Sequence, residues 1–410
     1  MRRRARHRGR RRWRHRLGRP PVASGRHLRA LFVTPIRPGL VGSGLAHRSA
    51  AWVRALSAVG DVSTLVVPVV DPGARVGAAD AHVVALPSGD EVRAGAIRGM
   101  AVPAVRTAMA TFDSGSGGVP LAAAAPPWLG AEAARHFAQA PPFDVVVCFR
   151  AYLAPFVVGL RASSPAVAAA RLVVDLDDDD AAFHHASGNA ALAAAYERLY
   201  GRLRMHAETR FVAAGVHALP GVVVLPNCVD LPADVSPPPA SGPILFVGNL
   251  TYGPNVDGLE WYLRSAHPLL LASGRHPMVR IVGRGGERFG DTAGVDVAGL
   301  VADLGPEYAA STVAIAPIRV GSGTRIKVLE AWAHGRPVVA TSAALEGLTF
   351  QPGLHALVAD SPTAFAEAVN AVLCDPSMAA AVGAAGRALV EQRYAATVFD
   401  SLVAGLVANG

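Results

Sequence analysis

Short, continuous apolar runs alternate with helix-like stretches along most of this chain, and this alternation constrains the fold more than any other feature. Runs such as Leu28–Thr34 and Val62–Val70 are typical of strands that are buried on both faces of a parallel sheet. The pattern stops at a Pro-rich stretch over residues 232–242 and then begins again. Two α/β domains with doubly wound parallel sheets are therefore predicted, one after the other.

The predicted elements fall into two groups, one on each side of the Pro-rich stretch. Expected strands cover residues 28–34, 62–70, 144–149, 171–176 and 221–225, then 243–247, 279–282, 312–316 and 338–340. Expected helices cover residues 45–58, 188–210, 256–271, 325–334, 362–374 and 377–392, whereas residues 71–130 give no clear pattern. A chain of 410 residues is also longer than one compact core usually supports. We expect an N-terminal domain over 28–231, a linker over 232–242, a C-terminal domain over 243–385 and a helical segment over 386–410.

The positive charge of the chain is concentrated at its N-terminus. The net charge is +8, and residues 1–29 hold 13 Arg and no acidic residue, so the remainder is mildly acidic. We expect residues 1–27 to form a disordered Arg-rich tail. Binding to anionic lipid, binding to nucleic acid and an over-long translation start all fit such a tail. Peripheral contact with an anionic membrane is kept as a hypothesis, and nucleic acid is not predicted as a partner.

The cysteines and the hydropathy pattern bear on the compartment. Cys148, Cys228 and Cys374 are far apart, without metal-binding spacing, and an odd number of such cysteines is typical of a reducing compartment. No apolar run reaches the roughly 18 residues that a membrane-spanning helix needs. The tail lacks the apolar stretch of a secretory signal. A cytoplasmic protein, at most peripheral to the inner face of the plasma membrane, is predicted.

One stretch, PIRVGSGTRIKVLE over residues 317–330, has the composition of a phosphate-binding site. A strand ends there, a loop with two glycines follows, and a helix begins near Thr324. Glycines let a phosphate approach the backbone, and a helix N-terminus offers free N–H groups with a partial positive charge. Arg325 and Lys327 add full charges, and Lys327 is the one lysine among 39 basic residues. This order of residues suits a nucleoside diphosphate, with its phosphates at the glycines and cations and its ribose hydroxyls at the Glu330 carboxylate.

A simpler explanation uses the same spacing. Lys327 and Glu330 are three positions apart, so an exposed ion pair on a helix surface, worth a few tenths of a kcal/mol, explains them equally well. The absence of every other lysine favours a functional role, because a site that needs a compact ammonium group would retain one.

The residues of this stretch resemble a known family. GSGTRIKVLEAWAHGRPVVATSAALEGL (321–348) is similar to the nucleotide-binding region of family 4 glycosyltransferases, in the branch with a GSGTRxKxLEA motif. The resemblance covers nearly all of 243–395, including FVGNLTYGPNVDGLEWYL (246–263), VRIVGRGG (279–286) and VAGLVADLGPEYAASTVAIAPI (297–318). LPNCVD (225–230) and, more weakly, LFVTPIRPGLVGSGLAHR (31–48) extend it into the first half. It implies the GT-B fold, with two facing Rossmann-like domains, parallel sheets and a last helical segment that packs back on the first domain.

The resemblance also implies an activity and a set of contacts. Members of this family move a sugar from a nucleotide donor, usually with retention at the anomeric carbon, and need neither a metal nor another cofactor. The donor implied here is a UDP- or GDP-sugar. The resemblance implies that the donor phosphates contact Gly321, Ser322, Gly323 and Thr324, that the ribose contacts Glu330, and that the base contacts Leu300 and Val301. Arg325 and Lys327 are the implied catalytic cations that stabilise the leaving group. Further implied donor contacts are Gly42, Gly44 and Gly248.

The chain departs from the family pattern at three places. The first residue of a usual pair of Glu, eight positions apart, is Ser322, which cannot act as a carboxylate. The loop GNLTYGPN after the first C-terminal strand lacks the usual Arg and Lys, and we expect Arg325 and Lys327 to compensate. Where many members have a His after the fourth N-terminal strand, this chain has Cys148-Phe149-Arg150, which makes Arg150 a candidate acceptor-side residue.

An acidic cluster, DLDDDD over residues 175–180, ends another predicted strand. Asp-x-Asp binds a metal in transferases of a different fold, but consecutive aspartates cannot all face one ion, so no metal site is predicted. A solvated loop at the edge of the cleft is favoured. Acceptor binding by Asp175 or Asp177 is the main alternative.

The sequence therefore predicts a glycosyltransferase that moves a sugar from a nucleotide donor to a hydroxyl of a glycan or lipid-linked acceptor. The resemblance implies a role in polysaccharide or cell-envelope synthesis. Two alternatives keep the same fold. A nucleotide-sugar epimerase would need no acceptor, and a non-catalytic nucleotide-sugar-binding scaffold would accommodate Ser322 and the missing His.

Overall fold

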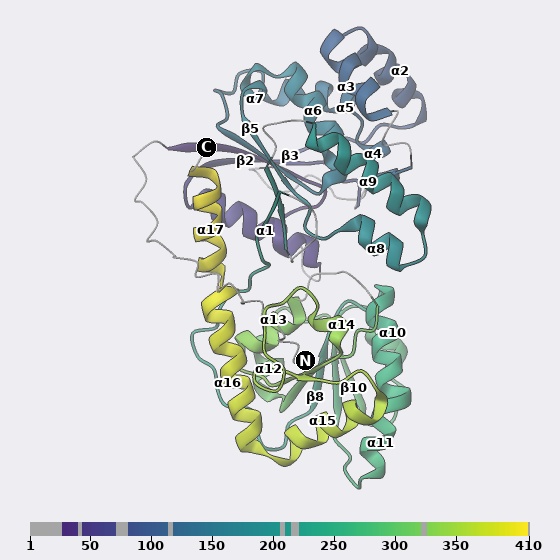
Figure 1. The fold of residues 1–410 in the computed structure, drawn as a ribbon, viewed down its shortest axis with the longest axis vertical. Coiled ribbons are helices and arrows are strands. Elements are labelled where there is room, and N and C mark those ends of the chain that lie inside the picture. The colour runs from purple at the N-terminus through teal and green to yellow at the C-terminus, as the bar shows by residue number, and fades with distance from the viewer. Residues whose placement is uncertain are drawn as a thin grey trace, which may run out of the picture.

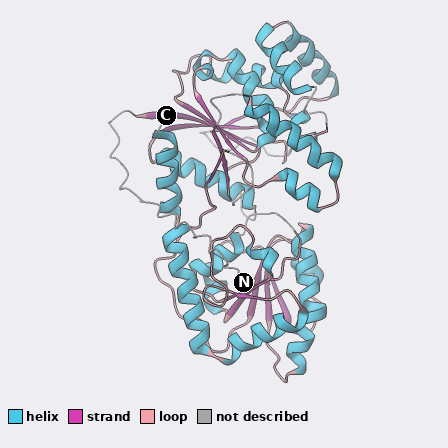
Figure 2. Ribbon diagram, viewed as in Figure 1, coloured by secondary structure: helices cyan, strands magenta, loops and turns pink. Residues whose placement is uncertain are grey.

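Parallel β-sheets form the centre of both halves of the chain, and helices cover their faces (Figure 1, Figure 2). The computed structural model describes residues 27–39, 43–70, 81–113, 118–205, 210–214, 221–320 and 326–408. Every strand pairing within the two described sheets is parallel. The two-domain α/β architecture predicted from the alternating pattern is confirmed.

The N-terminal sheet has the strand order β3-β2-β1-β4-β5-β6-β7. Side chains of β1 alternate between the two faces: Leu31 and Val33 join one apolar core, and Ala30 and Phe32 join the other. This explains why its sequence is apolar throughout. The strands are β1 Leu28–Thr34, β2 Gly60–Val66, β3 Ala81–Val83, β4 Val145–Phe149, β5 Arg171–Asp175, β6 Arg210–Ala213 and β7 Val222–Val224.

Helices on the N-terminal sheet include several short ones in the region that gave no clear sequence pattern. Helices α5 and α6 lie so close that a Cβ on Gly130 would approach the Phe156 carbonyl oxygen to 1.9 Å, so glycine is required there. Several of the short helices begin at proline, which suits the first turn because it lacks an N–H. The helices are α1 Gly44–Ser57, α2 Gly89–Met100, α3 Pro103–Asp113, α4 Pro120–Ala124, α5 Pro127–Ala133, α6 Ala154–Ser163, α7 Pro165–Ala168, α8 Asp180–Ala186 and α9 Ala190–Arg204.

The C-terminal sheet has the order β10-β9-β8-β11-β12-β13, with an apolar core on each face. Its strands are β8 Ile244–Val247, β9 Val279–Val282, β10 Val295–Gly299, β11 Val313–Ala316, β12 Val338–Ala340 and β13 Leu357–Val358. Its helices are α10 Gly253–Trp261, α11 His267–Ala272, α12 Gly305–Ala310, α13 Ile326–Ala333, α14 Ser342–Leu345, α15 Pro362–Cys374 and α16 Pro376–Arg393. The single helix predicted over 256–271 is instead split by a π-helical turn, Tyr262–Ala266, because Pro268 cannot donate to the hydrogen-bond ladder.

The chain crosses between the two domains twice, and the two crossings lie side by side. The backbone N–H of Val229 donates to the Tyr394 carbonyl at 2.9 Å, and the N–H of Ala396 donates to the Val229 carbonyl at 3.0 Å. Helix α17, Ala396–Ala408, then packs on α1, with Phe399 edge-on to Trp52 at a ring distance of 5.9 Å (Figure 1). Helix α16 is continuous through positions 385 and 386, so the segment that packs on the first domain begins at α17, later than the predicted boundary.

Among the described residues, no single helix is long and apolar enough to cross a membrane. Helices α15 and α16 reach that length and composition only as a pair, which is bent by 104°.

Candidate functional site

Three neighbouring strands of the C-terminal sheet lead into glycine at the same edge. Gly248 follows β8, Gly283 follows β9, and Gly299 ends β10. The Gly248 N–H donates to the Val282 carbonyl, and the Gly283 N–H donates to the Gly299 carbonyl at 2.7 Å. Gly283 has a φ of 138°, and a Cβ there would come within 2.0 Å of the Gly248 carbonyl oxygen. These three residues, the glycine floor, leave the carboxyl ends of β8, β9 and β10 without side chains at these positions. Parallel α/β sheets bind ligands at this edge.

Lys327 places its ammonium group beside this floor. Its Nζ donates to the side-chain oxygen of Asn255 at 2.7 Å and lies 4.5 Å from the centre of the Phe246 ring. A Cβ added to Gly248 would lie 3.0 Å from the same Nζ. Asn255 is held in turn, because its amide nitrogen donates to the Asn249 carbonyl at 2.7 Å. The cation expected to replace the missing Arg and Lys therefore lies against the loop that lacks them.

Glu330 lies almost one helical turn further along α13 and is half-buried. Burial raises the pKa of its carboxyl to about 7, although the Lys327 charge and hydrogen bonding from the Tyr308 hydroxyl both act to lower it. Tyr308 is fully buried and stacks on His334 at a ring distance of 4.7 Å. The exposed surface pair considered for Lys327 and Glu330 is therefore wrong, since neither side chain is exposed.

Several predicted donor contacts fall outside the described residues. These are Gly321, Ser322, Gly323, Thr324, Arg325 and Gly42. The described residues stop at Val320 and resume at the start of α13, where Lys327 lies beside Gly248. Gly44 is the first residue of α1 and is exposed, with open space around it. Leu300 is 50% exposed and follows Gly299 directly, whereas Val301 packs partly against the core.

Arg150 lies at the carboxyl end of β4 and is mostly buried in the N-terminal domain. Its backbone is left-handed, with a φ of 77°. One guanidinium nitrogen donates to Asp177 at 3.1 Å, and another donates to Asp180, the first residue of α8. Burial raises the pKa of Asp180 to about 6, although Arg150 acts to lower it. Arg150 and Asp177, both predicted acceptor-side residues, therefore meet, and Asp180 is a member of the cluster that the sequence did not single out.

Asp175 has a different environment from the one predicted. It is fully buried, and Arg48 contacts both of its carboxylate oxygens, at 2.7 and 3.0 Å. The indole nitrogen of Trp52 also donates to it at 2.5 Å. Direct acceptor contact by Asp175 does not fit this burial. The acidic cluster is not a solvated loop, because its buried members form ion pairs with Arg48 and Arg150. Arg48 and Trp52 are four positions apart and therefore share one face of α1. An Arg on this apolar helix face is the sequence feature that could have predicted a buried acidic partner.

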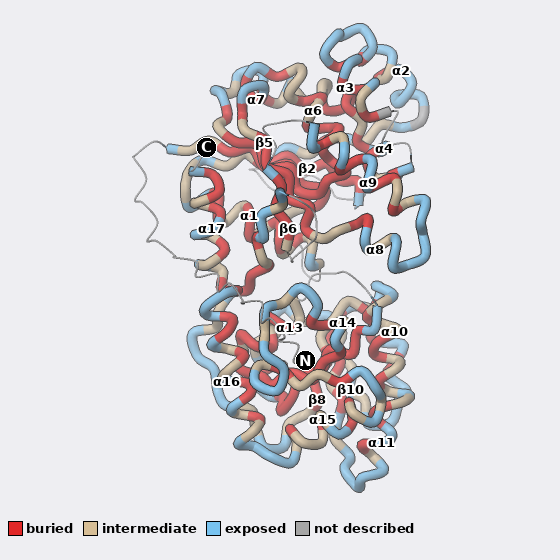
Figure 3. Tube along the Cα trace, viewed as in Figure 1, coloured by how far each residue is buried: buried red, intermediate tan, exposed pale blue. Residues whose placement is uncertain are grey.

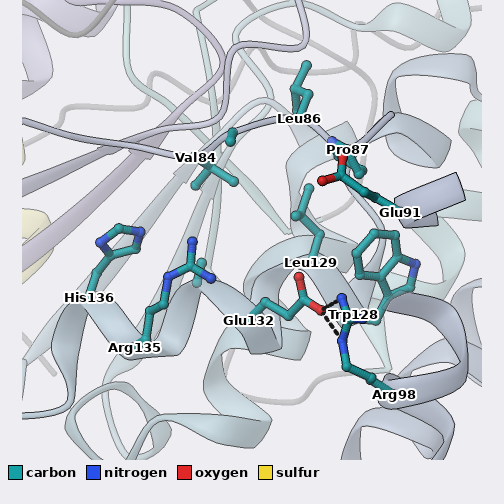
Figure 4. Close-up of a pocket in the computed structure, with 12 residues that line it drawn as sticks. Val84, Leu86, Pro87, Glu91, Arg98, Trp128, Leu129, Glu132, Arg135 and His136 are labelled. Atoms are coloured by element: carbon teal, nitrogen blue, oxygen red, sulfur yellow. Dashed lines mark hydrogen bonds and ion pairs between the residues drawn. The ribbon is translucent and has the colours of Figure 1, made fainter. Parts of the chain in front are cut away.

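Within the described ranges, no group of three or more His, Cys, Asp or Glu side chains is arranged to hold a metal ion. A separate pocket of about 200 Å³ lies on the N-terminal domain between the segment after β3, α2 and α5 (Figure 4). Trp128 and His136 line it, and an ion pair between Arg98 and Glu132, 2.5 Å long, crosses its wall. None of its residues belongs to the glycine floor or to the Arg150 cluster.

Part of the chain matches known protein sequences. Residues 242–375 match the sequence model of the family described as Glycosyl transferases group 1. A Klebsiella pneumoniae protein described as an uncharacterised 44.6 kDa protein in the cps region is 28% identical over 138 residues. That match spans 30% of this chain and 35% of the Klebsiella protein.

Solved structures resemble the chain over nearly its whole length. Sucrose-phosphate synthase from Thermosynechococcus elongatus superposes with a TM-score of 0.63 and 16% identity, covering 93% of this chain and 98% of that one. HepE from Anabaena, in complex with UDP and glucose, superposes with a TM-score of 0.61 and 14% identity. The match covers 94% of this chain and 100% of HepE. The fold is GT-B. WaaG, a glycosyltransferase involved in lipopolysaccharide biosynthesis, superposes with a TM-score of 0.59 and 14% identity. The match covers 93% of this chain and 100% of WaaG. The match of residues 242–375 to the group 1 glycosyl transferase model, together with the GT-B fold, supports a transferase enzyme.

Proposed function

We propose that this GT-B protein transfers a glycosyl group from a nucleotide-sugar donor to a hydroxyl of a glycan or lipid-linked acceptor. The observation that carries the proposal is the ammonium group of Lys327 beside the glycine floor. A fixed cation next to a surface without side chains suits a diphosphate, which needs both close approach and positive charge. The proposal includes membership of family 4.

The donor lies across the carboxyl end of the C-terminal sheet in this proposal. Its diphosphate lies over the glycine floor, against the loop of Gly321–Thr324 and the cations Arg325 and Lys327. Its ribose hydroxyls bond to Glu330, and its base lies against Leu300 and Val301. A UDP-sugar is the first choice, because HepE, which has the same fold, is described in complex with UDP and with UDP-glucose.

The chemistry requires stabilisation of a leaving diphosphate. As the glycosidic bond to phosphate breaks, negative charge grows on the departing oxygen, and a cation placed there in advance lowers the barrier. Lys327 is held by Asn255 and so needs little reorganisation to do this. Transfer with retention and without a metal ion is part of the proposal. Closure about the paired crossings at Val229 and Tyr394 would exclude water from the donor.

The acceptor belongs to a cell-surface glycan in this proposal. The Klebsiella relative is encoded in a cps region, and WaaG is described as involved in lipopolysaccharide biosynthesis. Attachment of the protein to the inner face of the membrane through the Arg-rich tail, residues 1–27, remains a separate hypothesis. Vesicles containing anionic lipid test it: equal binding by the full chain and by a chain lacking residues 1–27 contradicts it.

Calorimetry with a panel of UDP-, GDP- and ADP-sugars tests the donor site. We expect one donor to bind the wild type and Arg264→Ala, a control that removes an exposed cation elsewhere in the C-terminal domain, and to lose affinity for Lys327→Ala. Equal affinity of all three proteins for the donor contradicts the proposed role of Lys327. No binding by any donor contradicts the glycosyltransferase proposal itself.

Nuclear magnetic resonance of the product then tests the reaction. Retention predicts a product with the same anomeric configuration as the donor sugar, and activity in excess chelator tests independence from metal. Incubation of the donor without an acceptor is the control for epimerisation: a new sugar stereoisomer still attached to the nucleotide would identify an epimerase instead.

A further inference from the structure

Two strained residues mark the carboxyl ends of neighbouring strands in the N-terminal domain. In the part of the chain that the structure describes, Arg150 and Asp177 are the two non-glycine residues with a left-handed backbone, with φ values of 77° and 60°. Arg150 follows β4, and Asp177 follows β5, which pairs with β4. Such strain persists only where the surrounding structure enforces it, and it gathers at ligand sites.

The same cluster contains two buried polar atoms that lack a hydrogen-bond partner. They are Nε of Arg150, a donor, and Oδ2 of Asp180, an acceptor. Each residue is only 9% exposed. The remaining nitrogens of the Arg150 guanidinium are used, one by Asp177 and one by the other oxygen of Asp180. Native proteins rarely leave buried groups of this kind unpaired, so a ligand that supplies both a donor and an acceptor is expected.

The charges around these atoms define the chemistry of that ligand. Arg150 and Arg48 face three carboxylates, those of Asp175, Asp177 and Asp180. An anionic group would pair with Nε but would be repelled by the carboxylates, and a cation would pair only with Oδ2. A neutral hydroxyl both accepts and donates, so a group of this kind has the chemistry that the two atoms require.

The two unpaired atoms are themselves shielded from solvent, so a ligand contacts them only after a neighbouring side chain moves. Asp180 is the first residue of α8, whose later residues, such as Ala182 and His185, are exposed (Figure 3). Helix α8 lies on the side of the N-terminal domain that faces the C-terminal domain (Figure 1). Behind the carboxylate, the Tyr200 hydroxyl accepts a hydrogen bond from the Asp180 N–H at 3.1 Å, which fixes the start of the helix.

We propose that Arg150 and Asp180 bind a neutral, non-reacting hydroxyl of the acceptor, and that this pair disfavours acceptors with a carboxylate or phosphate at that position. The inference rests on the proposed glycosyl transfer, because it assigns the N-terminal domain to the acceptor. It adds Asp180 to the site and restricts the acceptor to a neutral sugar unit at the bound position.

Saturation-transfer NMR on the full chain tests the pair without knowledge of the acceptor. The probes are the neutral methyl glycosides of glucose, galactose, mannose and rhamnose, with methyl glucuronide and glucose 6-phosphate as anionic counterparts. The proteins are wild type, Asp180→Asn, which exchanges the free acceptor atom for a donor, and Arg150→Lys, which removes Nε but keeps the charge. Glu197→Gln, on the exposed face of α9, is the matched carboxylate control.

We expect at least one neutral glycoside to bind the wild type and Glu197→Gln, and to bind Asp180→Asn and Arg150→Lys roughly 10- to 100-fold more weakly. Equal binding in all four proteins, no binding by any neutral glycoside, or tighter binding of an anionic probe overturns the proposal. A change in melting temperature without a change in glycoside binding means that the two atoms hold only water, and also overturns it. Donor calorimetry on the same variants separates the two proposals, because glycoside binding without donor binding contradicts the transferase and leaves this site standing.

Discussion

The ammonium group of Lys327 lies 2.7 Å from the side-chain oxygen of Asn255, a residue 72 positions earlier in the chain. This contact joins the start of α13 to α10 and the loop that precedes it, and it fixes the cation beside Gly248. The amide of Asn255 is itself fixed by the Asn249 carbonyl, so the cation is positioned by a chain of two hydrogen bonds. Preorganisation of this kind is what a site for a developing negative charge requires.

Replacement of Asn255 by Ala should weaken donor binding without removing the cation. We expect an affinity about tenfold lower, which corresponds to loss of one hydrogen bond to a charged group. Calorimetry with the donor that binds wild type measures it. Asn370→Ala, on α15, is the matched control and should bind the donor as wild type does. A donor affinity in Asn255→Ala equal to that of wild type would show that the hydrogen bond to Asn255 is not needed to position Lys327.

Replacement of Gly248 by Ala should displace the same cation by steric contact. The added Cβ would lie 3.0 Å from Nζ of Lys327 and 3.2 Å from the amide nitrogen of Asn255. We expect donor affinity to fall at least tenfold while the protein still folds, because the lysine can move aside. Gly201→Ala on α9, where the new methyl group meets open space, is the control. Unchanged donor affinity in Gly248→Ala would exclude the glycine floor as the diphosphate site.

Amine-directed labelling should report the donor directly, because Lys327 is the one lysine in the chain. Acylation followed by mass spectrometry of the peptide gives its rate of modification. We expect the donor to slow this rate several-fold at Lys327 and to leave the rate at the N-terminal amine unchanged. Equal protection of both amines would indicate a non-specific effect of the nucleotide on the reagent.

Strands and helices could be predicted from the sequence where a local period defines them. The strands Leu28–Thr34 and Val279–Val282 have the predicted bounds, and α15 matches 362–374. The motif around Lys327 was found because glycines, cations and a helix start follow one another in the sequence. These features need no knowledge of distant contacts.

Contacts between distant residues could not be predicted in this way. The partner of Lys327 is 72 positions away, and the partner of Arg48 is Asp175, 127 positions away. The acidic cluster was therefore interpreted as solvated, because the arginines that form ion pairs with it belong to other elements. Short edge strands such as β3 were also missed, since three residues are too few to show a period.

Asp175 should prove essential to stability and not to acceptor binding. Asp175→Asn removes the nearer of the two carboxylates that pair with Arg48, which is also fully buried, and breaking a buried ion pair is costly. We expect the free energy of unfolding to fall by about 3 kcal/mol. Urea denaturation measures it, with the exposed Asp234→Asn as the control. Wild-type stability in Asp175→Asn, together with weaker glycoside binding, would restore the acceptor role.

Glu330, which we propose binds the donor, should reduce stability at neutral pH. Its pKa is about 7 in the folded protein against an ordinary value of 4.5, so between these values the unfolded chain ionises first and stability falls as pH rises. Glu330→Gln removes this effect. We expect the variant to match wild type near pH 4.5 and to exceed its free energy of unfolding by about 3 kcal/mol at pH 8. We also expect it to bind the donor about tenfold more weakly. Denaturation at both pH values and calorimetry at pH 8 measure these changes. A variant less stable than wild type at pH 8 would show that the carboxylate is needed for folding. Unchanged donor affinity would contradict the proposed contact between Glu330 and the ribose.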